Sequence, residues 1–331
     1  RCKRCGFACD AENVRGDFRR CPQWQPRSVG EAVAEPLVLD HLAEAGPLVV
    51  LLYYSYVDID NVKAALRWHR LLGEHLCLRG RIRVSPEGLN VILDGDPADV
   101  DFYCQAVRCS GNFGDDVDFK VSEAPAGYKR FPKLSCRPTS HVVELGVDGE
   151  HVRPGRGARH LSPLEWHQML AEGGSEDTVL LDTRNVYESR IGRFEGHGVE
   201  TIEVNTQHFA QFPEFVDRNL ERLSGKRVMM YCTGGVRCET ASSYLLSKVA
   251  AAEVVQLKGG ICRYLEQFRD RPQEGFFRGK NFVFDSRRYE PTHDGCVTGR
   301  CDGCGSPWDD YDNGPEARCQ TCRVLMLLCD A

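Results

Sequence analysis

The sequence lacks three features that would assign it to a specialised class. It contains no apolar run of the about 18 residues that a membrane-spanning helix needs, so no span is predicted. It has no excess of basic residues, because 42 Lys and Arg stand against 48 Asp and Glu and the net charge is -6. Nucleic-acid binding through overall charge is therefore not expected, although this balance allows a local basic patch. No residue pattern for a flavin, haem or iron site is present, so no organic cofactor is predicted.

What remains is the composition of an ordinary soluble globular chain with one exception. The 331 residues are 42% hydrophobic and 27% charged, which suffices for two or three cores. The exception is the high count of 17 cysteines, which gather at the two ends of the chain and form Cys-x-x-Cys pairs at the C-terminus. This pattern favours metal and thiolate chemistry in a reducing cytosol over the disulfides of a secreted protein, and a cytoplasmic location is expected.

One internal cysteine lies in a segment with a distinct local pattern. An apolar strand ends at Cys232, two glycines follow, and a helix-forming segment begins near Arg237. Positive φ at Gly234 and Gly235 would let the following amides point at one spot, beside the positive end of the helix. A thiol placed there is expected to be a thiolate at neutral pH. The alternative is a buried structural cysteine before an ordinary helix.

The loop Cys232–Arg237 resembles the active-site loop of the rhodanese (sulfurtransferase) family, in which the first cysteine carries the chemistry. The upstream segment 178–197, with an apolar strand ending in Asp182-Thr-Arg184, resembles the opening segment of the same family. Together the two motifs resemble the tRNA uridine hydroxylase branch and its eukaryotic rhodanese-like relatives. The resemblance implies a catalytic set of Cys232, Arg237, Asp182 and Arg184, and a substrate-binding loop of Thr233, Gly234, Gly235 and Val236.

The N-terminal part divides into a cysteine-rich segment at 1–26 and a predicted domain at 47–146. Cys2, Cys5, Cys9 and Cys21 either hold a zinc ion or belong to a solvent-exposed arm. In the domain, helices are predicted over Ile59–Leu76 and Pro97–Val107, and strands over Leu48–Tyr54, Gly80–Ser85, Leu89–Leu93 and Asp118–Val121. The order βαββαβ is that of a ferredoxin-like or acylphosphatase-like α+β fold. The aromatic signature of RNA-recognition motifs is absent.

A basic and aromatic stretch, Tyr128–Lys133, follows the last of these strands. Its cations Lys129, Arg130 and Lys133 are candidate substrate-binding residues that would contact tRNA phosphates. The alternative is a solvated loop, because short charge clusters are common on surfaces.

A second domain is predicted at 160–272, where strands and helices alternate as in the parallel-sheet α/β domain of rhodaneses. Ser162, Pro163 and Glu165 have the spacing of a helix start with a capping box. In such a sheet the loop after Cys232 lies at the carboxyl end of its strand, where open α/β sheets bind ligands.

The C-terminal extension at 273–331 carries two Cys-x-x-Cys pairs separated by residues 305–318. This spacing predicts a zinc ribbon in which each tight turn supplies two thiolates, from Cys301, Cys304, Cys319 and Cys322. Cys296 and Cys329 flank the pairs and are alternatives for any one ligand. With all positions filled by protein, the zinc is expected to be structural.

Three functions are compatible with these residues. The resemblance implies an oxygen-dependent enzyme that hydroxylates C5 of the wobble uridine in tRNA through Cys232. The alternatives are a sulfurtransferase that carries sulfur from a small donor as a Cys232 persulfide, and a non-catalytic rhodanese module that only binds a partner. Cys238 is either a resolving thiol for Cys232 or a packed helix residue. No membrane partner is expected.

Overall fold

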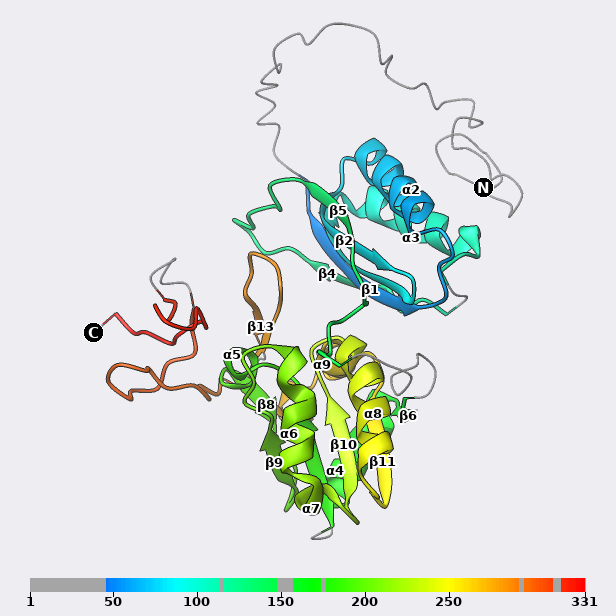
Figure 1. The fold of residues 1–331 in the computed structure, drawn as a ribbon. Helices are drawn as coiled ribbons and strands as arrows, with labels where there is room; N and C mark the ends of the chain where they lie inside the picture. Colours follow the sequence, from blue (N-terminus) through cyan, green and yellow to red (C-terminus); the bar gives the residue numbers. More distant parts are fainter. Residues whose placement is uncertain are drawn as a thin grey trace, which may run out of the picture. The chain divides into compact units, whose positions relative to one another are not determined.

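The computed structural model describes residues 46–113, 116–147, 157–173, 177–291, 295–311 and 317–330. The chain divides between Ser140 and His141 into two compact units (Figure 1). Each unit has its own hydrophobic core. Among the described helices, none combines the length and the apolar character needed to cross a membrane. The candidate ligands of the N-terminal segment, Cys2, Cys5, Cys9 and Cys21, lie outside the described residues.

The first unit contains the predicted βαββαβ order. Its elements are β1 (Val49–Tyr56), α2 (Val62–His75), β2 (Arg79–Ser85), β3 (Gly88–Gly95), α3 (Pro97–Ser110) and β4 (Lys120–Glu123). A further strand that the sequence analysis does not predict, β5 (Leu134–Pro138), pairs parallel to β2 and gives the sheet order β4-β1-β3-β2-β5. The strand is short and polar at several positions, which explains why its pattern does not predict it.

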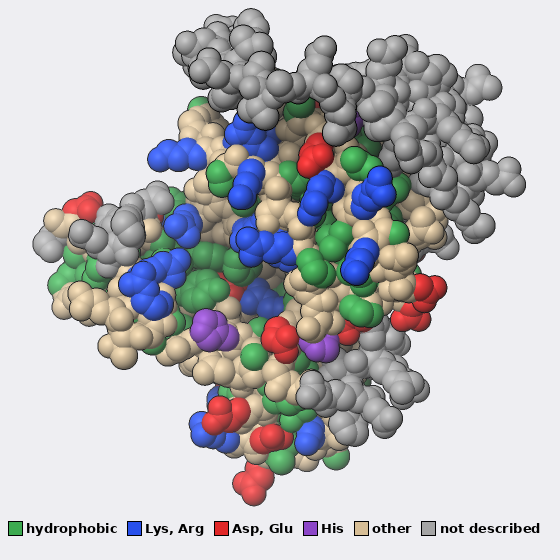
Figure 2. Space-filling view, turned by 45° about the horizontal axis from the view of Figure 1, so that its top comes forward, with side chains coloured by type: hydrophobic (Ala, Val, Ile, Leu, Met, Phe, Trp, Pro, Cys, Tyr) green, Lys and Arg blue, Asp and Glu red, His purple; other side chains and the backbone are tan. Residues whose placement is uncertain are grey.

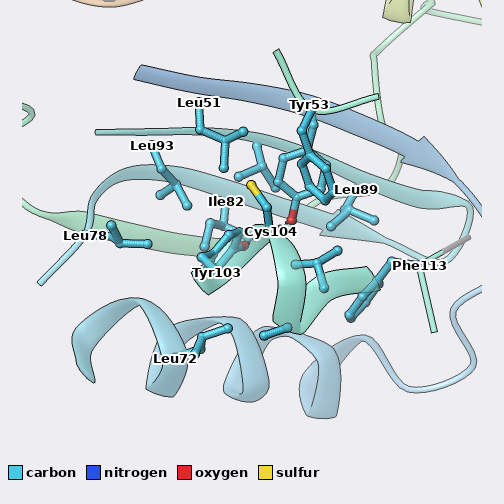
Figure 3. Close-up of a cluster of buried hydrophobic side chains, with 14 of the residues drawn as sticks. Leu51, Tyr53, Leu72, Leu78, Ile82, Leu89, Leu93, Tyr103, Cys104 and Phe113 are labelled. Atoms are coloured by element: carbon cyan, nitrogen blue, oxygen red, sulfur yellow. Dashed lines mark hydrogen bonds between the residues drawn. The ribbon is translucent and has the colours of Figure 1, made fainter. Parts of the chain in front are cut away.

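Local signals set the helix boundaries in this unit. Asn61 caps α2 by accepting a hydrogen bond from Ala64 N at 3.0 Å, and Asp96 caps α3 by accepting from Ala98 N at 2.9 Å. Both helices pack on one face of the sheet (Figure 1). Figure 3 shows the resulting core, which contains Leu51, Tyr53, Leu89 and Leu93 from the strands and Leu72 and Tyr103 from the helices.

The second unit is built on a five-stranded parallel sheet with the order β6-β11-β10-β7-β9. Its strands are β6 (Arg159–Leu161), β7 (Thr178–Asp182), β9 (Glu200–Glu203), β10 (Arg227–Tyr231) and β11 (Glu253–Leu257). The main helices are α4 (Pro163–Ala171), α6 (Phe212–Arg218), α8 (Val236–Lys248) and α9 (Gly260–Gln267). The predicted capping box of Ser162 and Glu165 at the start of α4 is confirmed.

Helices cover both faces of this parallel sheet. One core joins Val179 and Leu181 of β7 to helices α6 and α8, and a second joins Leu180 of the same strand to α4 and α9. Burial on both faces explains the continuous apolar runs of these strands. Polar groups are consequently concentrated at the ends of the strands.

A separate three-stranded sheet with the order β13-β12-β8 attaches the C-terminal segment to this unit. β12 (Phe277–Phe282) pairs antiparallel with β8 (Gly192–Phe194) and with β13 (Tyr289–Pro291). Tyr311 Oη donates a hydrogen bond to Tyr187 O at 2.8 Å, which holds the cysteine-bearing tail beside α5 (Val186–Ser189).

Candidate active site and C-terminal cysteine cluster

Cys232 lies directly after β10 and four residues before Val236, the first residue of α8, as the strand-loop-helix prediction requires. Its side chain is fully buried. Gly235 N donates to Cys232 Sγ at 3.1 Å, and Gly235 has a φ of 96°. The prediction of positive φ is confirmed for Gly235 and wrong for Gly234, which is not among the positive-φ glycines. One left-handed residue therefore suffices to turn the loop into the helix.

The start of α9 holds this loop through its backbone. Ile261 N donates to Cys232 O at 3.0 Å, and Cys262 N donates to Thr233 O at 3.0 Å. Gly260 has a φ of +66°, and a Cβ at this position would lie 2.6 Å from Cys232 O. Only glycine allows this approach. The sequence analysis does not assign Gly260 to the site, although its Gly-Gly signal marks a close backbone contact.

A buried ion pair forms the second wall of the loop. Arg237 donates to both carboxylate oxygens of Glu188 at 2.6 Å, and Thr233 Oγ1 donates to Glu188 Oε2 at 3.1 Å. The side chain of Glu188 has 0% exposure and that of Arg237 has 8%. The carboxylate thus fixes the orientation of two predicted site residues. Sequence reasoning missed Glu188, since it is one of several acidic residues in a polar segment.

The environment of Cys232 favours the thiolate. Burial alone would raise its pKa, but a hydrogen bond from the Cys238 thiol, the charge of Arg237 and amide hydrogen bonds outweigh burial and lower the pKa. The pKa of Cys238 is raised, because burial and its hydrogen bond to Cys232 both favour the protonated form. Thr183 Oγ1 lies 3.7 Å from Cys238 Sγ on its other side. The two cysteines therefore form a thiolate–thiol pair.

Asp182 and Arg184 form a fully buried ion pair, with Arg184 Nη2 2.6 Å from Asp182 Oδ2. Arg184 also donates to Gly192 O at 2.5 Å and to Glu188 O at 3.3 Å. The guanidinium group therefore positions the backbone that carries Glu188. These hydrogen bonds connect separate segments of the fold and, through the backbone of Glu188, support the ion pair of Glu188 and Arg237.

The predicted basic stretch is placed in the first unit, where a carboxylate anchors it. Asp94, which is fully buried, accepts hydrogen bonds from Arg130 Nε at 2.8 Å and from Phe131 N at 2.7 Å. Lys129 and Lys133 are exposed. Basic side chains (blue) are prominent on the face of the molecule drawn in Figure 2. Of the three predicted cations, Arg130 is thus held in an ion pair.

The C-terminal cysteines differ from the predicted ligand set. The Sγ atoms of Cys301, Cys304 and Cys329 all lie within 4.8 Å of one another. Among the described residues, Cys319 and Cys322 are not part of this three-thiol group, and their sharing of one site with Cys301 and Cys304 stays a prediction. The return of the chain end brings Cys329 N to 3.3 Å from Cys301 Sγ, a contact that spacing alone does not reveal.

Each Cys-x-x-Cys pair nevertheless occupies its own tight turn, and the two turns match. In the first, Cys301 N donates to Ser306 O at 2.8 Å and Gly305 N to Cys301 O at 2.9 Å; in the second, Cys319 N donates to Val324 O and Arg323 N to Cys319 O, both at 2.9 Å. The residues that close the turns, Gly305 and Arg323, have positive φ of 76° and 62°. The tail therefore contains two turns of one design.

Comparison with known proteins agrees with this architecture. Residues 48–142 match the family model of the UPF0176 acylphosphatase-like domain, and residues 278–331 match that of the rhodanase C-terminal segment. The chain is 37% identical over 285 residues to a tRNA uridine(34) hydroxylase of Rhodococcus jostii, covering 85% of this chain and 95% of that one. A tRNA uridine(34) hydroxylase of Corynebacterium jeikeium is 35% identical over 288 residues, covering 85% and 88%.

A plant relative extends beyond this region. Rhodanese-like domain-containing protein 6 of Arabidopsis thaliana is 39% identical over 295 residues, which cover 85% of this chain. The match spans 50% of the Arabidopsis protein, whereas it spans nearly the whole of the bacterial relatives.

Proposed function

The chain belongs to the tRNA uridine(34) hydroxylase family of rhodanese-domain proteins, and we propose that it is an oxidoreductase that hydroxylates C5 of uridine 34 in tRNA through Cys232. The observation that carries this proposal is the thiolate–thiol pair of Cys232 and Cys238 beside the Glu188–Arg237 wall. A thiolate of this kind is a nucleophile suited to an electron-poor ring.

The proposed reaction balances with the two thiols as reductant. Addition of the Cys232 thiolate to C6 of the uracil makes C5 nucleophilic towards molecular oxygen. One oxygen atom is inserted into the C5–H bond, and the other leaves as water. The two electrons for that water come from Cys232 and Cys238, which close a disulfide as the base is released; one proton comes from the Cys238 thiol and the other from solvent. A soluble dithiol then reduces the disulfide and restores both thiols.

Arg237 has a supporting role in this scheme. Its guanidinium group stays charged and faces both the Cys232 sulfur and the Glu188 carboxylate. Because Glu188 holds it in place, the positive charge is available to the thiolate before substrate binds. This is electrostatic preorganisation, which costs no rearrangement at the moment of reaction.

The test uses unmodified tRNA incubated with the protein in air and with a dithiol, followed by digestion and mass measurement of the nucleosides. A uridine heavier by one oxygen is expected, with loss of this product in Cys232→Ala. Cys238→Ala is expected to lose multiple turnover, because it cannot form the disulfide. Its Cys232 is expected to keep part of the lowered pKa and to remain reactive as a thiolate. A thiosulfate-to-cyanide assay on the same samples is the comparison. Sulfur transfer with unchanged tRNA would establish the sulfurtransferase alternative instead.

We further propose that Cys301, Cys304 and Cys329 bind a structural zinc ion. Three thiolates converge within 4.8 Å, which fits the sulfur-rich donor set of structural zinc and leaves one tetrahedral position for a further donor. The zinc content of the purified chain is expected to fall in Cys301→Ser with Cys304→Ser. The matched variant Cys319→Ser with Cys322→Ser alters the second turn and is expected to retain this ion. Equal zinc contents in the two variants would contradict the assignment.

A further inference from the structure

The sheet of the first unit has a second face, opposite to the helices. Side chains alternate along each strand, so residues between the core positions Leu51, Tyr53, Leu89 and Leu93 point to this second face. Besides the apolar Val50, Leu52 and Ile92, this face carries a set of polar, basic and aromatic side chains: Tyr54, Tyr56, Arg79, Arg81, Arg83, Asn90, Lys120 and Arg137. We call this set the second sheet face. It is distributed over five strands, which is why no local motif reveals it.

One row of residues crosses the second sheet face through four adjacent strands. Tyr54 of β1 is paired with Asn90 of β3, Asn90 with Arg83 of β2, and Arg83 with Arg137 of β5. Neighbouring strands are about 4.8 Å apart, so the row extends over roughly 15 Å. An aromatic ring, an amide and two guanidinium groups therefore follow each other in a line.

The aromatic end of the row is partly exposed and lies beside a cation. Tyr54 and Tyr56 have ring centroids 6.0 Å apart at an interplanar angle of 72°. Lys120 Nζ lies 5.3 Å from the centroid of the Tyr54 ring. Lys120 is itself buried and paired with Asp118 at 2.7 Å, so this end of the row contributes tyrosine rings for stacking and leaves the phosphates to the arginines.

The basic end of the row concentrates positive charge. Arg83 donates to Ser135 O at 2.9 Å and to Ile82 O at 3.2 Å, which fixes its guanidinium group on the sheet. Burial and the charges of Arg137 and Arg81 lower the pKa of Arg83. Arg137 is exposed. The neighbouring guanidinium groups therefore repel each other, and an anion bound among them would relieve that repulsion.

The acidic side chain on this face does not neutralise the row. Asp94 lies two residues beyond Ile92 on β3, and its carboxylate accepts hydrogen bonds from Arg130 and Phe131. Among the side chains that the five described strands direct to this face, Asp94 is the single carboxylate. A chain with a net charge of -6 thus keeps a local surface for a polyanion.

We propose that the second sheet face binds a single-stranded stretch of RNA, with a base stacked on Tyr54 and phosphates held by Arg83 and Arg137. The inference rests on the proposed function, because it names the surface that engages the RNA substrate. Charge complementarity selects a polyanion, and the aromatic end favours unpaired bases over a duplex, whose bases are already stacked. An acidic protein would use the arginines and leave Tyr54 without a role.

The experiment measures binding of the full-length protein to fluorescent oligouridine over a range of salt concentrations. Tyr54→Leu is expected to weaken binding about tenfold, as the loss of one stacked base implies, and Tyr54→Phe is expected to retain it. Arg83→Gln with Arg137→Gln is expected to reduce the salt slope by about 1.4, because each single-strand phosphate contact contributes about 0.7. The control Lys63→Gln with Arg67→Gln removes the same charge from exposed positions of α2, on the opposite layer, and is expected to keep the slope.

Several outcomes would overturn the inference. The inference is overturned if the wild-type protein does not bind oligouridine, if the arginine variant keeps the wild-type salt slope, or if paired RNA binds as tightly as single-stranded RNA. It is also overturned if poly-glutamate displaces oligouridine equally well from the wild-type protein and from Tyr54→Leu. Thermal unfolding of each variant shows whether it is folded, and Tyr54→Phe keeps the test informative if Tyr54→Leu unfolds. The proposed function is tested separately. If the protein binds oligouridine on this face but leaves tRNA unmodified, the proposed hydroxylation is contradicted and the proposed RNA-binding surface is not.

Discussion

The carboxylates of Glu188 in the second unit and Asp94 in the first are both fully buried. Each needs a partner for its buried negative charge, and the two partners differ in exposure. Glu188 is held by Arg237, whose side chain is 8% exposed, and Asp94 by Arg130, whose side chain is 28% exposed. The first pair is sealed beside the reactive thiol, whereas the second fastens a surface loop. The role of an arginine in a sequence motif therefore depends on the carboxylate with which it pairs in the fold.

The largest expected effect comes from breaking the sealed pair. Glu188→Gln leaves the Arg237 guanidinium group buried without its counter-charge, which is expected to lower the free energy of unfolding by on the order of 3 kcal/mol. Product formation on tRNA should be lost with it. Denaturant unfolding and the tRNA assay measure both. The control Glu214→Gln removes one partner of an exposed i,i+4 pair and should cost less than about 0.5 kcal/mol. Equal losses in the two variants would remove the distinction between sealed and surface pairs.

Asp94→Asn should have a smaller effect in the other unit. Asparagine retains an acceptor for Phe131 N, and Arg130 has solvent within reach, so a loss of about 1 to 2 kcal/mol in the free energy of unfolding is expected. The rate at which Cys232 is alkylated should not change, because this carboxylate contributes nothing to the thiol loop. A change in that rate would show that the two carboxylates are not independent.

The pH dependence of alkylation measures how strongly the second unit favours the thiolate. The midpoint for Cys232 is expected well below the usual thiol pKa of about 8.5. Cys238→Ala removes a hydrogen bond that favours the charged form, so the midpoint should rise by about one pH unit. Because the folded-state pKa is lowered, this thiolate stabilises the fold above the unfolded-state pKa, and the contribution disappears as pH falls through the folded-state value. A midpoint unaffected by Cys238→Ala would assign the lowering to Arg237 and the amides alone.

The smallest expected effect belongs to the exposed lysines beside Arg130. Lys129→Gln with Lys133→Gln should change the free energy of unfolding by less than about 0.5 kcal/mol. If these lysines contact tRNA phosphates, the salt slope of tRNA binding should decrease by at most about 1.4. Salt-dependent binding measurements, compared with Lys63→Gln and Arg67→Gln, separate this contribution from a general loss of charge. An identical slope in wild type and variant would restrict phosphate contacts to other residues.

The sequence predicted elements whose signals are local. The βαββαβ order, the capping box at Ser162 and the loop that turns at Gly235 all follow from spacing within a few residues. Features that depend on chain segments far apart were not predicted. Glu188 becomes part of the site because it meets Arg237, and the return of the tail places Cys329, which the spacing gave only as an alternative ligand, beside Cys301.

The same limit applies to charge. Arg130 lies in a loop and has the sequence context of a nucleic-acid contact, yet Asp94 of the distant strand β3 determines its environment. The second sheet face shows the opposite case, in which aromatic and basic residues from separate strands meet without any motif. Strand pairing, which sequence alone specifies poorly, decides both outcomes.

The close approach of Gly260 to the Cys232 loop has a consequence for motion. Because amides of Ile261 and Cys262 donate to the carbonyl groups of Cys232 and Thr233, the loop and the start of α9 are expected to open as one cooperative unit. Cys232 is fully buried, so a base reaches its sulfur only when surrounding groups move aside. The frequency of that opening sets an upper limit on turnover, and the protection of these amides from hydrogen exchange is its direct measure.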